Sequence, residues 1–196
     1  MHATPAAAGA PQVWLLGSSD YSAQLAAHLG LPYVFANHFS GDGLERALDL
    51  YRTGFVASEW LSEPATFLTI NAVAAPTDEE AQARALPQLR AMARLRSNKP
   101  SIPLETIEQA QAGSVADADP AAEDNLRRMR SRWLVGDAAH VASELRAFAT
   151  RYGVNEVMVS PVSGSFDGEA MDAAPGRVQT LGLLASELIA DAATAK

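Results

Sequence analysis

The chain has 196 residues, of which 48% are hydrophobic, so it is long enough for one domain with a sizeable core. Its formal net charge of −8 at pH 7 argues against the basic face that nucleic-acid binding requires, and we expect no nucleic-acid partner. It contains no cysteine, which excludes disulfides and thiolate metal sites and fits a cytoplasmic protein.

The opening residues predict a lead-in and not a part of the fold. Residues 1–11 are small, Ala-rich and Pro-bearing, and they lack the basic start and the apolar stretch of a signal peptide. We therefore predict a flexible lead-in over residues 1–11 and a single domain over residues 12–196. No apolar stretch in the sequence approaches the roughly 20 residues of a membrane span, so we expect no membrane partner.

Short β-type runs alternate with helical patterns along the rest of the chain. Apolar runs bounded by Gly or Pro predict strands, and apolar residues at helical spacing predict helices. The predicted strands are residues 13–16, 32–36, 65–75 and 154–162. The predicted helices are residues 21–30, 42–55, 77–97, 104–112, 122–133, 136–153 and 176–193. This alternation predicts an α/β fold of parallel βαβ units.

The helix predicted over residues 77–97 has a clear start and an interruption. Thr77 is a good cap, and Glu80 stands at the capping-box position. Pro87 removes a backbone hydrogen bond inside this helix, so we predict a kink or a break there.

The first strand ends in a turn that carries several hydroxyl groups. In parallel α/β folds, ligands bind beyond the carboxyl ends of the strands. Gly17 allows a tight turn there, and Ser18, Ser19 and Ser22 follow it. The next helix offers free N–H groups and the positive end of its dipole, which suits a phosphate. The local pattern favours a serine that simply caps this helix, with phosphate binding as the alternative.

Other polar residues near strand ends are less specific. His38 follows the second strand, where it faces a ligand or serves as a hydrogen-bonded structural residue. The arginine-rich residues 127–132 favour a solvated helix face over a phosphate site. Residues 160–168 are small enough to approach a ligand closely, or they form an ordinary flexible connection. No set of His, Asp and Glu has the spacing of a metal site, and we expect none.

Three stretches of the chain carry a family resemblance. They are PQVWLLGSSDYSAQLAAHLGLPYVFANHFS (11–40), INAVAAPTDEEAQ (70–82) and VGDAAHVASELRAFATRYGVNEVMVSPV (135–162). The chain resembles the bacterial-luciferase-like flavin monooxygenases, and most of all their luciferase family oxidoreductase branch. This resemblance implies a (β/α)8 barrel that binds reduced FMN at its carboxyl-end mouth. It also implies that O2 oxidises a small-molecule substrate and that a partner flavin reductase supplies the reduced FMN.

The resemblance also implies roles for individual residues. It places the flavin phosphate at Ser18 and Ser19, with Tyr21 and Ser22 as further contacts, and Gly17 permits the close approach. His38 is then the candidate for a catalytic residue.

The length of the chain limits what the resemblance implies. A full barrel takes about 250 residues, and the four strand–helix units predicted here match its C-terminal half. We therefore expect a fragment of a longer enzyme or a chain that pairs with another chain, including a second copy of itself. The leading interpretation is a truncated FMN-dependent monooxygenase. The alternatives are a non-catalytic flavin- or phosphate-binding protein that keeps half of the barrel and an inert truncation product.

Overall fold

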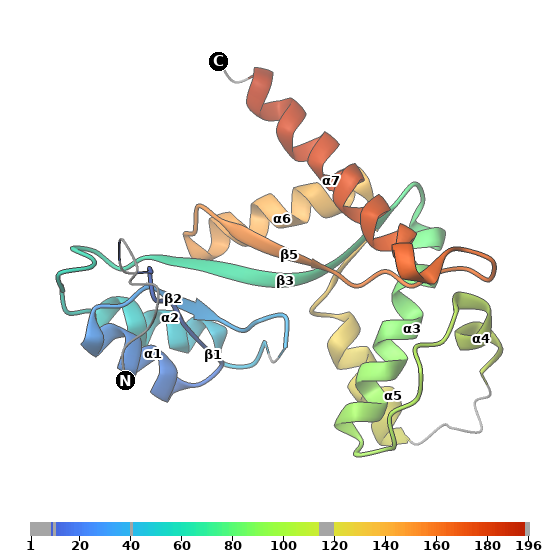
Figure 1. The fold of residues 1–196 in the computed structure, drawn as a ribbon, viewed down its shortest axis with the longest axis horizontal. Helices are drawn as coiled ribbons and strands as arrows, with labels where there is room; N and C mark the ends of the chain where they lie inside the picture. The colour runs from blue at the N-terminus through green and yellow to red at the C-terminus, as the bar shows by residue number, and fades with distance from the viewer. Residues whose placement is uncertain (1–8, 10, 40, 114–119, 195–196) are drawn as a thin grey trace. The chain divides into compact units, whose positions relative to one another are not determined.

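The computed structural model describes residue 9 and residues 11–39, 41–113 and 120–194 (Figure 1). The chain divides into two compact units, Met1–Leu68 and Thr69–Lys196. Apart from Gly9 and Pro11, the predicted lead-in lies outside the described residues. Within the described ranges, no helix is long and apolar enough to cross a membrane.

The first unit is built from parallel strands and two helices. Its elements are β1 (Leu15–Gly17), α1 (Asp20–Leu29), β2 (Tyr33–Phe35), α2 (Leu44–Thr53) and the start of β3 (Thr66–Ala75). In the parallel register, Gly17 lies opposite Phe35, and Phe35 lies opposite Leu68. The carboxyl ends of β1 and β2 therefore meet at one edge of the sheet.

The two helices of the first unit pack through small and apolar side chains. α1 ends at Gly30, whose φ of 60° is left-handed, as is common for the glycine that stops a helix. Tyr51 of α2 is fully buried, and its hydroxyl donates to Leu31 O at 2.9 Å or to Ala65 O at 3.1 Å. This side chain therefore joins the segments that lead into β2 and β3. The buried residues of the helix pair are Ser22, Ala23, Ala26, Ala27, Leu44, Ala47, Leu48 and Tyr51.

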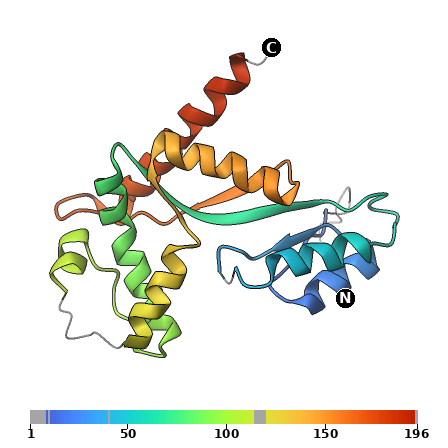
Figure 2. The ribbon, with the colours of Figure 1, turned by 180° about the vertical axis from the view of Figure 1, so that it is seen from behind.

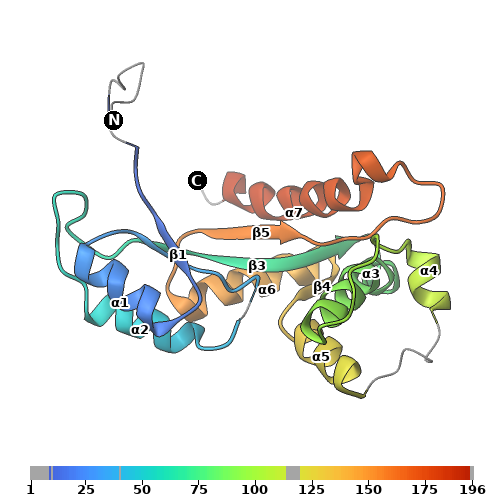
Figure 3. The ribbon, with the colours of Figure 1, turned by 60° about the horizontal axis from the view of Figure 1, so that its bottom comes forward.

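The second unit contains the rest of β3 and most of the helices. Its other strands are β4 (Leu134–Asp137) and β5 (Val157–Pro161), which both pair with β3. The arrows of β3 and β5 point the same way (Figure 3). The helices are α3 (Asp78–Arg96), α4 (Ile107–Ala112), α5 (Pro120–Arg130), α6 (Ala138–Tyr152), the short 3-10 helix η2 (Met171–Ala173) and α7 (Pro175–Thr194). The predicted α/β fold with parallel βα units is confirmed.

Both faces of β3 are covered in the second unit, because its side chains alternate between two cores. Val73 and Ala75 pack with residues of α3, α5 and β4 and with Trp133, which lies between α5 and β4. Ile70, Ala72 and Ala74 pack with residues of α6 and α7. α3 and α5 lie side by side (Figure 2).

Two elements differ from the sequence prediction. A kink or a break was predicted at Pro87, and the break does not occur, because α3 is a single helix from Asp78 to Arg96. The Pro87 ring is fully buried against the loop after β5, where a Cβ on Gly164 would lie 2.7 Å from its Cγ. This packing offsets the lost hydrogen bond. In addition, residues 134–137 form a strand that the sequence pattern does not predict, since their pairing partner, β3, is distant in sequence.

A threonine hydroxyl completes the hydrogen bonding of β3 where β5 has ended. The Thr180 Oγ1 accepts from Ala74 N at 3.2 Å and donates to Ala74 O at 3.0 Å. The Ser163 Oγ lies 2.7 Å from Thr180 Oγ1. Thr180 is fully buried, so α7 supplies a hydrogen-bond partner to backbone groups that would otherwise have none in the core.

The Thr180→Val substitution keeps the shape of this side chain and removes its hydroxyl. We expect the free energy of unfolding to fall by about 1–3 kcal/mol, because two buried backbone groups lose their partner. The control is Thr150→Val, since that hydroxyl bonds to Arg146 O on the exposed face of α6. Denaturant unfolding of both variants measures the difference, and equal losses would contradict this role of Thr180.

Candidate functional site

The loop between β1 and α1 is shaped by a reciprocal serine cap. Ser19 is the N-cap residue, and its Oγ accepts from Ser22 N at 3.3 Å. The Ser22 Oγ accepts from Ser19 N at 3.3 Å and donates to Ser19 O at 2.7 Å. A reciprocal cap of this kind satisfies amides that the helix itself leaves free. The capping interpretation of the sequence is therefore confirmed for Ser19.

The same loop is braced from β2 by a buried tyrosine. The Tyr33 hydroxyl lies 3.2 Å from Ser22 Oγ, and it donates to Gly17 O at 3.3 Å. Burial raises the pKa of Tyr33, and the hydrogen bond with Ser22 only partly opposes this effect. The phenol therefore stays protonated and holds the loop as a donor. Ser22 is 8% exposed, so its hydroxyl lies on the buried side of the loop and bonds to protein groups there.

Gly17 has a structural reason to be glycine. A Cβ placed on Gly17 would lie 2.3 Å from Ser22 Oγ and 2.4 Å from Ser22 Cβ. The reciprocal cap therefore requires that this position carry no side chain.

Several donors on the outer side of this loop remain available. Ser18, Ser19 and Tyr21 are exposed, and Tyr21 is 73% exposed. The amides of Asp20 and Tyr21 are the first two of α1, and such amides have no partner within their own helix. The positive end of the helix dipole points the same way. Of the predicted residues, the structure therefore brings Ser18, Ser19 and Tyr21 to an open helix end, with Gly17 and Ser22 beneath them.

A charged pair stands beside this helix end. The Asp20 carboxylate bonds to Arg46 Nε of α2 at 2.8 Å, and the Arg46 side chain is 72% exposed. Arg46 partly neutralises the Asp20 carboxylate, which would repel an anion here. The sequence alone does not identify Arg46, because only the packing of α2 on α1 brings it to this loop.

His38 lies in the turn that follows β2. It is half-buried and interacts with another part of the protein. Phe35, the last residue of β2, lies opposite Gly17 of β1 in the register. His38 comes shortly after Phe35, so it lies beyond the same end of the strands as the loop after β1. Its catalytic role stays a prediction.

Metal ligands and the arginine run do not form a second site in the described part of the chain. Groups of three or more His, Cys, Asp or Glu placed to hold a metal ion are absent from those residues. Arg127 pairs with Asp124, and Arg128 donates to Asn125, both on the exposed surface of α5. These contacts agree with the solvated helix face that the sequence favours.

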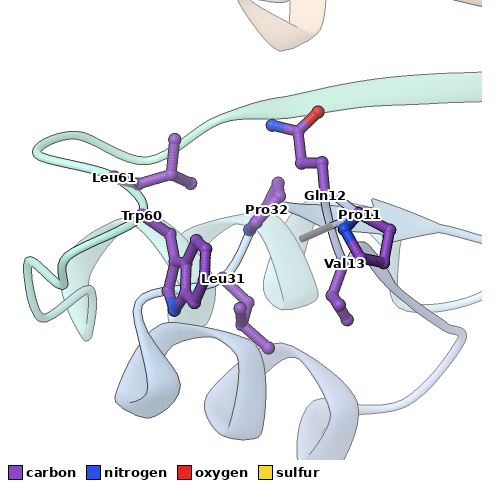
Figure 4. Close-up of a pocket in the computed structure, with 7 residues that line it drawn as sticks. All are labelled: Pro11, Gln12, Val13, Leu31, Pro32, Trp60 and Leu61. Carbon is purple, nitrogen blue, oxygen red and sulfur yellow. The ribbon is translucent and has the colours of Figure 1, made fainter. Parts of the chain in front are cut away.

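A pocket of about 420 Å³ lies at the other end of the strands (Figure 4). Its lining is mainly apolar and comes from the segments that lead into β1, β2 and β3. The lining residues are Pro11, Gln12, Val13, Leu31, Pro32, Trp60 and Leu61. Because ligands of parallel α/β folds bind at the carboxyl ends of the strands, this pocket is not the predicted site.

Comparison with known proteins places the chain in a family. The family model described as luciferase-like monooxygenase matches residues 1–156. The chain belongs to this family. A luciferase-like monooxygenase of Escherichia coli strain K12 is 36% identical over 151 residues, which are 76% of this chain and 43% of that protein. The uncharacterized protein YceB of Bacillus subtilis strain 168 is 36% identical over 173 residues, which are 86% of this chain and 49% of that protein.

Solved structures agree with the fold. The crystal structure of apo-MsnO8 has a TM-score of 0.75 and 28% identity, and the match covers 94% of this chain and 53% of that chain. The oxygenating constituent of 3,6-diketocamphane monooxygenase from Pseudomonas putida was solved in complex with FMN. It has a TM-score of 0.60 and 20% identity, so it supports the fold alone. The βα units are thus of the luciferase-like barrel type, and the chain spans about half the length of these relatives.

The Gly17→Ala substitution tests whether the loop is as tightly packed as the structure indicates. We expect the free energy of unfolding to fall by about 1–3 kcal/mol, because the new methyl group overlaps Ser22. Gly182→Ala is the matched control, since a Cβ there meets nothing within 4 Å. Alanine is the better helix former, so the control should gain up to about 1 kcal/mol. Thermal or denaturant unfolding measures both values, and a harmless Gly17→Ala would contradict the packing.

Proposed function

We propose that this chain binds FMN, with the flavin phosphate at the amino-terminal turn of α1, and that it acts in an FMN-dependent monooxygenase reaction. The observation that carries the proposal is the open helix end after β1. There, the exposed hydroxyl of Ser18 lies near the first two amides of α1, those of Asp20 and Tyr21, while the exposed Ser19 hydroxyl also bonds to Ser22. Family membership supports the reaction class, and one structural neighbour was solved with FMN bound.

The residues present fit a phosphate group. Hydroxyl and amide donors at a helix start suit a dianion, and the helix dipole adds to their effect. Arg46 offsets the negative charge of Asp20 and supplies an exposed cation at the same end. Tyr33 and Ser22 hold the backbone in place, so the donors are preorganised when the ligand arrives. The assignment of Gly17, Ser18, Ser19, Tyr21 and Ser22 to flavin binding is therefore part of the proposal.

The flavin would supply the redox chemistry with O2, and the protein would orient it and its substrate. We propose that His38 is the catalytic candidate, because an imidazole at the carboxyl end of β2 is able to carry a proton. A small-molecule substrate and a partner reductase that delivers reduced FMN in the cytoplasm complete this proposal.

The first strand supports a further partner for the chain. β1 pairs with β2 alone among the described strands, and Leu16 of β1 is 61% exposed. An apolar side chain on an open strand edge favours association. We propose that additional strands of the barrel come from a longer chain or from a second chain, including a second copy of this one.

Two flavins that differ only at the phosphate test the proposed site. We expect FMN to bind with at least about tenfold higher affinity than riboflavin, because charge-assisted hydrogen bonds to the phosphate add that much. In the double variant Ser18→Asp/Ser19→Asp, this preference should disappear, since the new carboxylates repel the phosphate. Aspartate is itself a good N-cap, so α1 should remain folded. Flavin fluorescence titration at fixed salt measures all four affinities.

A control with the same added charge separates local from overall repulsion. Ser62 and Ser101 are exposed serines outside the loop between β1 and α1. The double variant Ser62→Asp/Ser101→Asp should keep the preference for FMN over riboflavin. An unchanged preference in the Ser18/Ser19 variant, or an equal loss in the control, would contradict the site.

The alternative function is non-catalytic flavin or phosphate binding, for which the exposed donors at the start of α1 are sufficient. The rate at which photoreduced FMN reacts with O2 distinguishes the two functions. The monooxygenase proposal predicts that saturating protein changes this rate and that His38→Ala alters the change. Tight FMN binding with no effect on the rate would favour the binding protein.

A further inference from the structure

The loop between β5 and α7 is fixed by contacts from several elements. Gly164 N donates to Arg84 O of α3 at 2.6 Å, and Ile107 N of α4 donates to Ser165 O at 3.0 Å. Asp167 N donates to the Glu108 carboxylate of α4 at 2.8 Å. This loop is therefore not the flexible connection that the sequence left open as one alternative.

The centre of these contacts is a buried arginine. Arg84 is 5% exposed, and its Nε donates to Glu80 Oε1 at 2.7 Å. Its terminal nitrogens donate to Gly164 O at 3.1 Å and to the two carboxylate oxygens of Glu169 at 3.2 and 3.0 Å. The guanidinium also lies 4.6 Å from the centre of the Phe166 ring, within cation–π range.

These partners show how Arg84 acts. A guanidinium has five N–H groups, and Arg84 makes four hydrogen bonds to protein oxygens. Little donor capacity is left for a ligand. Arg84 therefore acts on the loop after β5 and not on a bound molecule directly.

The backbone around Arg84 is close enough to depend on glycine. A Cβ on Gly176, in the first turn of α7, would lie 2.6 Å from Gly164 O and 2.8 Å from Arg84 Nη1. The start of α7 therefore packs directly against the loop backbone and the Arg84 side chain.

We infer that Arg84 is a positioning residue, which holds residues 162–169 at the carboxyl end of β5 in their ligand-competent form through its bond to Glu169. Loops at this end of parallel strands carry the binding and catalytic groups of such folds. That this loop serves ligand binding rests on the proposed function, whereas the hold of Arg84 on the loop does not.

The Glu169 carboxylate gives this hold a pH dependence. The hydrogen bond from Arg84 lowers the pKa of Glu169, and the hydrogen bond from Phe166 N also lowers it, while burial opposes both. A carboxyl whose pKa is lowered by folding stabilises the folded state at neutral pH, and that stabilisation is lost as the pH falls through the lowered pKa. Glu80 also bonds to Arg84, Glu108 of α4 accepts from Asp167 N, and Asp167 itself belongs to the loop, so these three carboxylates are further charged groups near Glu169.

Hydrogen exchange of the amides in residues 162–169 tests the inference. At neutral pH, we expect Glu169→Gln to raise their exchange by about tenfold or more relative to the wild type. Arg84→Lys should restore part of the protection that Arg84→Gln loses, because lysine keeps the charge but not the forked geometry. Arg127→Gln, which removes an exposed arginine–carboxylate pair on α5, should leave the loop unchanged.

The pH dependence of exchange distinguishes a local effect of the Arg84–Glu169 bond on this loop from a change in overall stability. In the wild type, protection of residues 162–169 should fall before that of α6 as the pH is lowered through the lowered pKa of Glu169, and in Glu169→Gln this early fall should be absent. Equal protection in wild type and Glu169→Gln, or loss of protection in the loop and α6 together, would overturn the inference. If Arg84→Gln does not fold, Glu169→Gln still decides, since its side chain is similar in size. Because no flavin is added in this experiment, failure of FMN binding leaves its result intact.

Discussion

β3 is the constraint on which the rest of the structure depends. Its first residues pair with β2, its last residues pair with β4, and β5 also pairs with it. Residues 68–75 are all buried, so every side chain of this stretch must fit a core. Beyond the end of β5, the Thr180 hydroxyl bonds to the backbone of β3 in place of that strand. Each of the two units is therefore assembled on its own part of this strand.

The loop after β1 is fixed by contacts on its inner side and has exposed side chains on its outer side. Ser19 and Ser22 satisfy each other's amides, and Tyr33 ties them to β2. Their inward groups are therefore used by the fold, while the outward donors remain open at the start of α1. Capping and phosphate binding are compatible at such a helix start, as the sequence already indicated, because the cap uses the third amide of α1 and leaves the first two.

Local signals in the sequence predict much of the fold. Thr77 caps α3 as predicted, and Gly30 and Gly153 end α1 and α6 in left-handed conformations, because caps depend on near neighbours. The βα order and the family resemblance likewise follow from contiguous residues. β4 and the unbroken helix at Pro87 were not predictable in this way, since both depend on contacts with distant residues. The same limit applies to the candidate site, where the support from Tyr33 and the charge of Arg46 come from other elements. The role of Arg84 is harder still to predict from the sequence. Its partner Glu169 lies 85 residues away, and only the packing shows that this helix arginine is buried.

An amide-resolved NMR titration of the isotope-labelled chain with FMN tests the placement of the flavin phosphate without any substitution. We expect saturable shifts that are largest at the amides of Ser18, Asp20 and Tyr21, and inorganic phosphate should move the same amides more weakly. Shifts confined to the apolar pocket around Trp60 and Leu61, or no saturable shift at α1, would contradict the placement of the phosphate.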